Sequence, residues 1–263
     1  MKYQNLTIGC DPEFFLKGTD GFIGAFNFLK GTKWKPEAID EHGSAILHDN
    51  VMVEFNTQPA TNSDEFVASI NKVLSHLRTR IPADIEFSFL PSAHFDKQRL
   101  RSRAAQTFGC EPDFNAWCGG MVNPAISCDD ATLRTSGGHI HVGFEEVTRE
   151  KQLELITHMD LYLGVPSILM DADGAERRLM YGKAGAFRPK PYGAEYRVLS
   201  NFWIKSDLYK EWAFMATKRC TDDLNNGFCF DDKDDIDGMF AAINDNNVDA
   251  ARYLVNKYNL PMV

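Results

Sequence analysis

Hydrophobic and polar positions alternate in five short stretches of the chain, and this alternation predicts strands. The stretches lie near residues 6–16, 51–56, 84–90, 138–144 and 194–199. In the second stretch, Val51, Val53 and Phe55 share one face, so Glu54 is expected to face away from the apolar side.

Apolar residues at three- and four-residue steps predict helices elsewhere. The clearest helix is expected at 64–80, behind the acidic first-turn residues Asp64 and Glu65. Similar patterns occur at 148–163, 206–219 and 247–258. The last of these follows the acidic run at 231–237, so residues 231–263 are predicted to form a helical C-terminal appendage.

The order of these elements favours an α+β fold. Strands and helices do not alternate regularly, and neither a GxGxxG nor a GxxxxGK[ST] phosphate loop is present. Rossmann and P-loop folds are therefore disfavoured. No repeat or linker interrupts residues 1–263, and we expect a single catalytic domain with a largely antiparallel sheet and helices on one side.

Composition narrows the class of protein. Hydrophobic residues at 44% and charged residues at 25% are typical of a soluble globular enzyme. The net charge of -9 argues against direct nucleic-acid binding, and we read the basic run at 97–103 as a solvated face or a loop near a nucleotide. The six cysteines form no CxxC pair, so free thiols are expected. The N-terminus has no apolar run, so a cytoplasmic protein without a membrane span is expected.

Two acidic strands point to a metal. Asp11 and Glu13 are two residues apart, so on one strand they would share a face with Cβ atoms roughly 6 to 7 Å apart. Like charges this close repel, and a divalent cation is the natural compensation. The alternative is a solvent-facing strand, which is less common between Ile8 and Phe14. Glu54 alone would be an ordinary surface residue.

Two further strands carry polar pairs at the same spacing. His139 and His141 share one face of 136–144 and follow a pair of glycines that allow close backbone approach. Glu195 and Arg197 share a face of 193–199. Taken singly, the first strand could carry an ordinary core histidine, and the second could carry an ordinary exposed ion pair. Together they indicate a site for two or more magnesium ions with a nucleotide over it.

A cationic segment lies between these two strands. Residues 177–192 are rich in Gly and Pro and are predicted to be a loop able to hold a polyphosphate. Its basic residues are Arg177, Arg178, Lys183, Arg188 and Lys190.

Four motifs in this order resemble the glutamine synthetase and glutamate-cysteine ligase superfamily, and more narrowly the phage-type COOH-NH2 ligases (type 2). The motifs are GCDPEFF, DNVMVEFNTQPA, SGGHIHVGF and GAEYRVLSNFW. The resemblance implies a glutamine-synthetase-like catalytic domain with a curved sheet and helices on its outer face. It also implies an ATP- and Mg²⁺-dependent ligase that joins a carboxylate to an amine through an acyl phosphate, with Mn²⁺ able to substitute.

The resemblance also implies residue roles. Glu13 and Glu54 would hold one magnesium, while Asp11, His139 and Glu195 would hold another that is bound to ATP phosphates. The remaining roles are assigned to basic residues, to the second histidine and to residues expected near the substrate. Arg188 and Arg197 would face the transferring phosphoryl group, Arg178 and Lys183 would contact phosphate, His141 would touch nucleotide or substrate, and Asp49, Asn50 and Asp113 are assigned to the substrate.

The chain departs from glutamine synthetase at several points. Asp11 stands where a longer Glu is usual, and the acidic HHE segment before Glu54 is missing, with Asp49 as its candidate replacement. The segment 108–123, which contains Asp113, is placed at the amine pocket, with an ordinary loop as the alternative. The chain lacks the separate N-terminal domain, so a ring-shaped assembly is not assumed, although an oligomer is compatible with the sequence.

Two rival functions are retained. A guanidino kinase would use a related sheet and stop at a phosphorylated nitrogen, and a regulatory protein would bind nucleotide without turnover. The order of the motifs favours the ligase. The sequence does not identify the carboxylate or the amine substrate, and for a phage-encoded enzyme the compartment would be the host cytoplasm.

Overall fold

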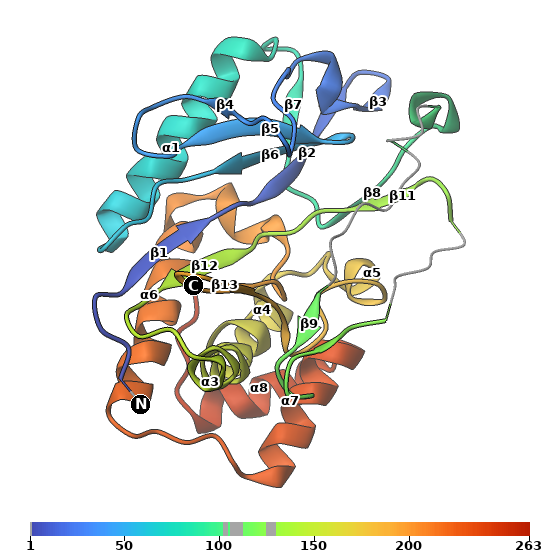
Figure 1. The fold of residues 1–263 in the computed structure, drawn as a ribbon. Helices are drawn as coiled ribbons and strands as arrows, with labels where there is room; N and C mark the ends of the chain where they lie inside the picture. Colours follow the sequence, from blue (N-terminus) through green and yellow to red (C-terminus); the bar gives the residue numbers. More distant parts are fainter. Residues whose placement is uncertain (1, 102–104, 106–112, 125–129) are drawn as a thin grey trace.

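The computed structural model describes residues 2–101, 105, 113–124 and 130–263. Its strands form two antiparallel sheets, one above the other in Figure 1, and a separate two-stranded ribbon. The predicted α+β class with antiparallel strands is therefore confirmed, but the strands are divided between two sheets instead of forming one.

The lower sheet in Figure 1 has the strand order β1-β12-β14-β13-β9-β10. Its strands are β1 (Thr7–Cys10), β12 (Ile140–Gly143), β14 (Gly193–Tyr196), β13 (Ala186–Lys190), β9 (Phe114–Asn115) and β10 (Met121–Val122). The upper sheet has the order β3-β2-β6-β5-β4, with β7 also paired to β2. Its strands are β2 (Glu13–Gly18), β3 (Gly21–Ile23), β4 (Glu37–Ala38), β5 (Ala45–Asp49), β6 (Met52–Asn56) and β7 (Glu86–Ser88). The ribbon joins β8 (Ser92–His94) to β11 (Leu133–Thr135).

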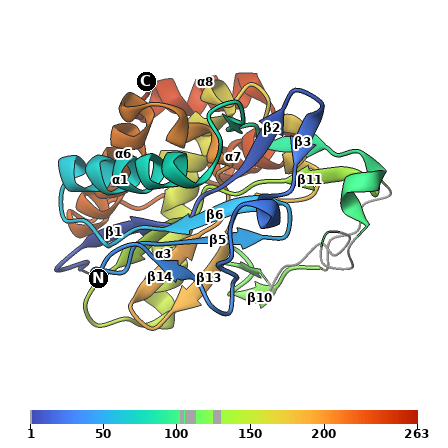
Figure 2. The ribbon, with the colours of Figure 1, turned by 90° about the horizontal axis from the view of Figure 1, so that it is seen from above.

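Helix α1 (Ser63–Arg80) agrees with the helix predicted at 64–80. Its N-cap Asn62 accepts a hydrogen bond from the backbone N–H of Glu65, and Phe66, Ile70 and Val73 are buried on its inner face. Phe66 packs against Trp203 and Phe214, and Figures 1 and 2 show α1 beside α6 (Asp207–Asn225). The helix thus covers the upper sheet and connects it to the helical layer.

The helical layer packs on the outer face of the lower sheet (Figure 1). It contains α3 (Arg149–Met159), a π-helical turn at Asp160–Gly164, α4 (Val165–Met170), α5 (Ala175–Arg178), α6, α7 (Lys233–Asp245) and α8 (Val248–Lys257). The 3-10 turns at Ala25–Asn27, Lys97–Leu100 and Asn201–Lys205 complete the described helical elements. The predicted helices at 148–163, 206–219 and 247–258 are all present.

Helix α7 lies within the predicted helical appendage, but its bounds were not predicted, because aspartates dominate the segment where it begins. The Asp232 side chain caps the helix by accepting hydrogen bonds from the N–H groups of Asp234 and Asp235. Asp235 is buried, and its carboxylate accepts a hydrogen bond from Lys257 of α8 at 2.6 Å. Met239 and Ile243 of α7 belong to the main hydrophobic cluster, so the tail expected as an appendage contributes to the main core.

Strand β13 corrects the predicted loop at 177–192. Arg188 and Lys190 lie on this strand, and Arg177 and Arg178 lie on α5. Pro189 had indicated a loop because it has no N–H to donate. The described pairing of β13 with β9 involves Ala186 and Phe187 and ends before Pro189, so the missing N–H of Pro189 interrupts no described pair of these two strands.

Candidate active site

The chain passes from the lower sheet to the upper sheet at Asp11 and Pro12, between β1 and β2. Pro12 cannot donate to a ladder, and the backbone is held here by Glu13 N–H, which donates to Gly137 O at 2.8 Å. The single strand predicted through 6–16 is therefore interrupted. As a result Asp11 approaches the histidines of β12, while Glu13 approaches the acids of β5 and β6.

Glu13, Asp49 and Glu54 form the first acidic group. Each offers a carboxylate oxygen, and these oxygens lie within 4.8 Å of one another. Register explains the meeting, since Glu13 and Glu54 are directly paired across β2 and β6 and Asp49 ends the adjoining strand. Among the described residues none of the three forms an ion pair with a Lys or Arg.

The described residues compensate the charge of this group poorly. Burial raises the pKa of Glu13 to about 8, and the Asp49 carboxylate contributes to the rise. Burial and the Glu13 carboxylate raise the pKa of Glu54 well above its usual value, and burial also raises the pKa of Asp49. The one hydrogen bond from the described backbone comes from Gly137 N–H to Glu13 Oε2 at 2.7 Å.

Asp11, His141 and Glu195 form the second group, again with ligand atoms within 4.8 Å of one another. His141 and Glu195 are paired across β12 and β14, and His141 Nε2 lies 3.0 Å from Asp11 Oδ1. Burial alone would raise the pKa of Asp11, but the imidazoles of His141 and His139 outweigh it and hold the pKa well below the usual range.

Cations surround Glu195. Lys190 Nζ lies 2.7 Å from its Oε2, Arg188 Nη1 lies 3.5 Å from its Oε1, and Arg197 Nη1 contacts the same Oε1. Burial and Asp11 would raise the pKa of Glu195, but Arg197 and the two histidines lower it to about 2. The second group is therefore compensated by protein charges, in contrast to the first.

His139 lies beside the second group, next to Asp11 and Glu195 as the sequence predicts. Its Nδ1 lies 3.1 Å from Asp11 Oδ1 and 3.7 Å from Glu195 Oε1, but the same atom also lies 3.3 Å from Arg197 Nη1. Arg197 in turn donates from Nε to Asp113 Oδ1 at 2.5 Å. Burial lowers the pKa of His139, and the Arg197 guanidinium lowers it further.

Two of the predicted phosphate contacts are elsewhere. Arg178 is buried in an ion pair with Asp171, with 3.2 Å between Nη2 and Oδ2. Lys183 donates to the backbone carbonyl of Asn244 at 2.8 Å. Neither residue lines the two cavities of the site. Adjacent residues of a helix point about 100° apart, so Arg177 faces the site and Arg178 does not.

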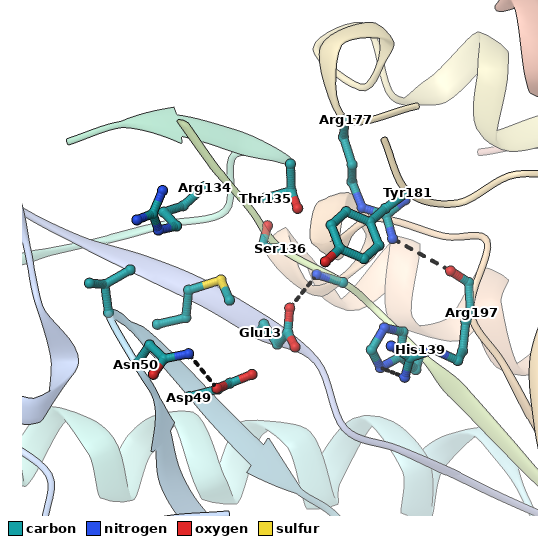
Figure 3. A pocket seen from close by; sticks show the side chains of 13 residues that line it. Glu13, Asp49, Asn50, Arg134, Thr135, Ser136, His139, Arg177, Tyr181 and Arg197 are labelled. Carbon is teal, nitrogen blue, oxygen red and sulfur yellow. Dashed lines mark hydrogen bonds between the residues drawn. The ribbon is translucent and has the colours of Figure 1, made fainter. Parts of the chain in front are cut away.

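The first cavity, drawn in Figure 3, has a volume of about 50 Å³. Glu13, Asp49 and Asn50 lie on one side of it, and His139, Arg177, Tyr181 and Arg197 lie on the other. Arg177 is buried and donates from Nη1 to Val198 O at 2.8 Å, while its Nε has no hydrogen-bond partner among the described residues. Sequence reasoning grouped Arg177 with the cationic loop and did not assign Tyr181.

The second cavity has a volume of about 510 Å³ and lies beside the other group. Its lining includes Asp11, His141, Lys190, Thr57 and Tyr192. Asp11 contacts both His139 of the first cavity and His141 of the second, so the two cavities border one cluster of charged side chains. Tyr192, which sequence reasoning did not assign, hydrogen-bonds to His141.

Behind the site, the buried Asp160 holds three segments together. Its carboxylate accepts hydrogen bonds from Tyr196 Oη at 2.9 Å, Trp117 Nε1 at 2.7 Å and Gly185 N–H at 2.7 Å. Burial raises the pKa of Asp160 to about 7 despite these donors. The segment predicted as an amine pocket falls partly outside the described residues, as do Cys110 and Cys128. The four described cysteines are free.

Residues 132–223 match the model of a family described as phage phiEco32-like COOH-NH2 ligase-type 2. The matched part contains β12, β13 and β14 but not the first acidic group. No curated protein matches the chain.

Among solved structures, the crystal structure of a bifunctional glutathione synthetase from Pasteurella multocida is similar, with 9% sequence identity and a TM-score of 0.44. The match covers 97% of this chain and 49% of that one, so the chain spans about half of its length. Within the described part of the chain, no helix has the length and apolar character needed to cross a membrane.

Proposed function

We propose that this protein is an ATP- and Mg²⁺-dependent ligase that joins a carboxylate to an amine through an acyl phosphate, on a glutamine-synthetase-like sheet. The observation that carries the proposal is that two groups of potential metal ligands lie close together, each beside its own cavity. The first is Glu13, Asp49 and Glu54, and the second is Asp11, His141 and Glu195. The family match of residues 132–223, which contain His141, Glu195, Arg188 and Arg197, supports the same reaction class.

The residues present fit divalent cations. Glu13, Asp49 and Glu54 supply oxygen ligands, which Mg²⁺ prefers, and their raised pKa values reflect negative charge that the described protein groups leave uncompensated. Asp11, His141 and Glu195 supply oxygens and one imidazole, a set that suits Mg²⁺ or Mn²⁺. Cations bound at these groups would neutralise and orient phosphate oxygens.

We assign the two ligands to the two cavities by size. Small-molecule sites usually enclose about 300 to 1,000 Å³, so the cavity of about 510 Å³ beside Lys190 and His141 is suited to the nucleotide. The cavity of about 50 Å³ holds only a few atoms, and its buried Arg177 and Arg197 are suited to a carboxylate end. The substrate carboxylate would then lie between the arginines and the nucleotide.

The chain's own groups then stabilise charge and position reactants. A carboxylate oxygen attacks the γ-phosphorus, the bond from that phosphorus to the β-phosphate oxygen breaks, and ADP leaves. Arg188 and Arg197 neutralise the charge on the transferring phosphoryl group. The amine next attacks the acyl carbon, the bond to phosphate oxygen breaks, and phosphate leaves with a proton from the amine. Both steps balance without a protein nucleophile.

The test is phosphate release from ATP and Mg²⁺ with pooled amino acids, small amines and peptides, followed by mass spectrometry. We expect ADP, phosphate and an amide-linked product, all abolished by Glu13→Gln. Glu211→Gln, which changes an exposed carboxylate on α6, is the matched control and should retain activity. A stable phosphorylated nitrogen compound without free phosphate would contradict the ligase and identify a kinase.

A further inference from the structure

A tight turn formed by residues 32–35 stands beside β5. Thr32 N–H donates to Lys35 O at 3.0 Å, and Lys35 N–H donates back to Thr32 O at 2.9 Å. The turn is fixed to the sheet, because His48 N–H of β5 donates to Gly31 O at 2.9 Å. The tip of the turn is therefore held in place beside the strand that ends at the first acidic group.

This tip exposes an indole between two lysines. Trp34 is 88% exposed, more than any other large hydrophobic side chain in the described part of the chain. Lys33 and Lys35 are exposed as well, and neither forms an ion pair with a described residue, since the nearby Glu37 and Asp40 are paired with cations of α1. Tryptophan is enriched among the residues that dominate binding energies at interfaces, so the turn has the composition of a binding surface.

The charge of the turn reaches the first acidic group. Burial raises the pKa of Asp49, and the Lys33 ammonium is the strongest of the charges that oppose this rise. Lys33 also opposes the rise in the pKa of Glu54. The cavity beside this group has a volume of about 50 Å³, so a carboxylate substrate can enter it with one end only. The rest of such a substrate must lie outside the cavity.

The turn lies within reach of a substrate held in this way. The path from Asp49 to Trp34 is one step along β5, one step across to Thr32 and two steps along the turn. At about 3.3 Å per residue and about 4.8 Å between neighbouring segments, this path is no longer than roughly 15 Å. An extended peptide covers roughly 15 Å with about four or five residues, whereas a single amino acid does not.

We propose that the carboxylate substrate is an acidic peptide segment, with one carboxyl group in the first cavity and its further residues on the turn at 32–35. The inference rests on the proposed function, which places a carboxylate in that cavity. Acidic side chains of the peptide complement Lys33 and Lys35, and the indole of Trp34 offers a large contact area at a low cost in conformational entropy. A nucleic acid would also complement a cationic turn, but it has no carboxylate for the reaction to activate.

The test measures binding by surface plasmon resonance with Mg²⁺ and without ATP. The probes are a pool of mixed-sequence octapeptides in which half of the positions are Asp or Glu, the same pool with Asn and Gln at those positions, free glutamate, and an oligothymidylate of eight nucleotides. The variants are Trp34→Ala and the double lysine variant Lys33→Gln with Lys35→Gln. The matched control is Arg252→Gln with Tyr253→Ala, which removes an adjacent exposed cation and aromatic ring from α8.

A second measurement locates the contact. The chain has four tryptophans, and ¹⁹F NMR of protein that contains 5-fluorotryptophan resolves them. The resonance that is lost in Trp34→Phe belongs to Trp34. We expect the acidic pool to shift this resonance, and free glutamate and the oligonucleotide to leave it unchanged.

Trp34→Ala should weaken binding of the acidic pool about 10-fold or more, and the double lysine variant should weaken it about 5-fold. The neutral pool should bind to the unsubstituted protein about as weakly as the acidic pool binds to the double lysine variant, because either change removes the same charge pairs. The control should bind like the unsubstituted protein.

Four results would overturn the inference: no binding of the acidic pool, equal binding of the two pools, binding that does not depend on Trp34, or tighter binding of the oligonucleotide than of the acidic pool. Peptide binding requires no turnover, so a protein that is inactive in the ligase assay affects none of these results. An active ligase that binds no acidic peptide would overturn this inference and leave the proposed function intact.

Discussion

Replacing Glu13 by Gln should stabilise the metal-free protein while removing its response to magnesium. The Glu13 side chain shares a buried group with Asp49 and Glu54, and burial raises its pKa to about 8 from the usual 4.5. Because the pKa is raised on folding, the carboxyl contributes stability below about pH 4.5, and that stability is lost as the pH rises through about 8. A neutral amide avoids this loss and still accepts the Gly137 hydrogen bond.

The magnitude follows from the pKa shift. Between pH 4.5 and pH 7 the unfolded carboxyl ionises while the folded one stays largely protonated, which corresponds to about 3 to 3.5 kcal/mol at ~1.4 kcal/mol per pH unit. For a chain of this size that is roughly 6 to 14 °C in melting temperature. Saturating Mg²⁺ at 100 times its Kd would stabilise the unsubstituted protein by about 2.7 kcal/mol, and Glu13→Gln should lose most of this response.

The assay is thermal unfolding after chelation, from pH 5 to pH 8, with and without Mg²⁺. The unsubstituted metal-free protein should lose stability as the pH rises, Glu13→Gln should lose less, and Glu211→Gln should behave like the unsubstituted protein. A metal-free Glu13→Gln protein that melts below the unsubstituted protein would refute the reasoning, since it would mean that the carboxylate is already compensated.

Three further predictions concern other parts of the site. Gly138→Ala should destabilise by about 1 to 3 kcal/mol, because the new Cβ would lie 2.2 Å from Ser200 O. The same change at Gly238 in α7, where the new Cβ would lie 3.9 Å from Leu254 Cδ1, should stabilise the protein by about 0.5 to 1 kcal/mol in urea unfolding. Equal effects at the two glycines would contradict the packing argument. Asp160→Asn should lower the free energy of unfolding by about 1 to 3 kcal/mol, because three donors point at the two carboxylate oxygens and an amide has only one accepting oxygen. An unchanged free energy in urea unfolding would show that these hydrogen bonds contribute little. Arg177→Lys should raise the KM for the carboxylate at least about 10-fold with a smaller change in the KM for ATP, because Lys cannot replace a bidentate guanidinium. Equal changes in both KM values would show that Arg177 does not bind the carboxylate.

Periodicity predicted the elements whose side chains alternate between core and site. Glu54 and Glu195 could be placed on the polar face of their strands because the other face of each strand is apolar. Helix α1 could be predicted because its apolar steps continue over several turns. Such patterns depend on neighbouring residues alone. The meeting of Asp49 with Glu13 depends on pairing across two strands, and it was anticipated only as a replacement for a missing acid.

Other features depend on information that local patterns lack. Arg177 and Arg178 are adjacent and chemically identical, and the orientation of the short helix α5 alone decides which one faces the cavity. Tyr192 becomes a partner of His141 because the β13–β14 turn folds back on β12, a contact across 51 residues. The break at Pro12, which separates Asp11 from Glu13, could have been anticipated from the missing N–H.

The central claim is that a substrate carboxylate is activated by ATP, and its most direct test follows one oxygen atom. The carboxylate identified by the pooled assay is labelled with ¹⁸O and supplied with ATP, Mg²⁺ and the amine. The account predicts that one ¹⁸O atom per turnover appears in inorganic phosphate and that the amide product retains the other. Amide formed without ¹⁸O in phosphate, or label found in ADP or AMP, would contradict it.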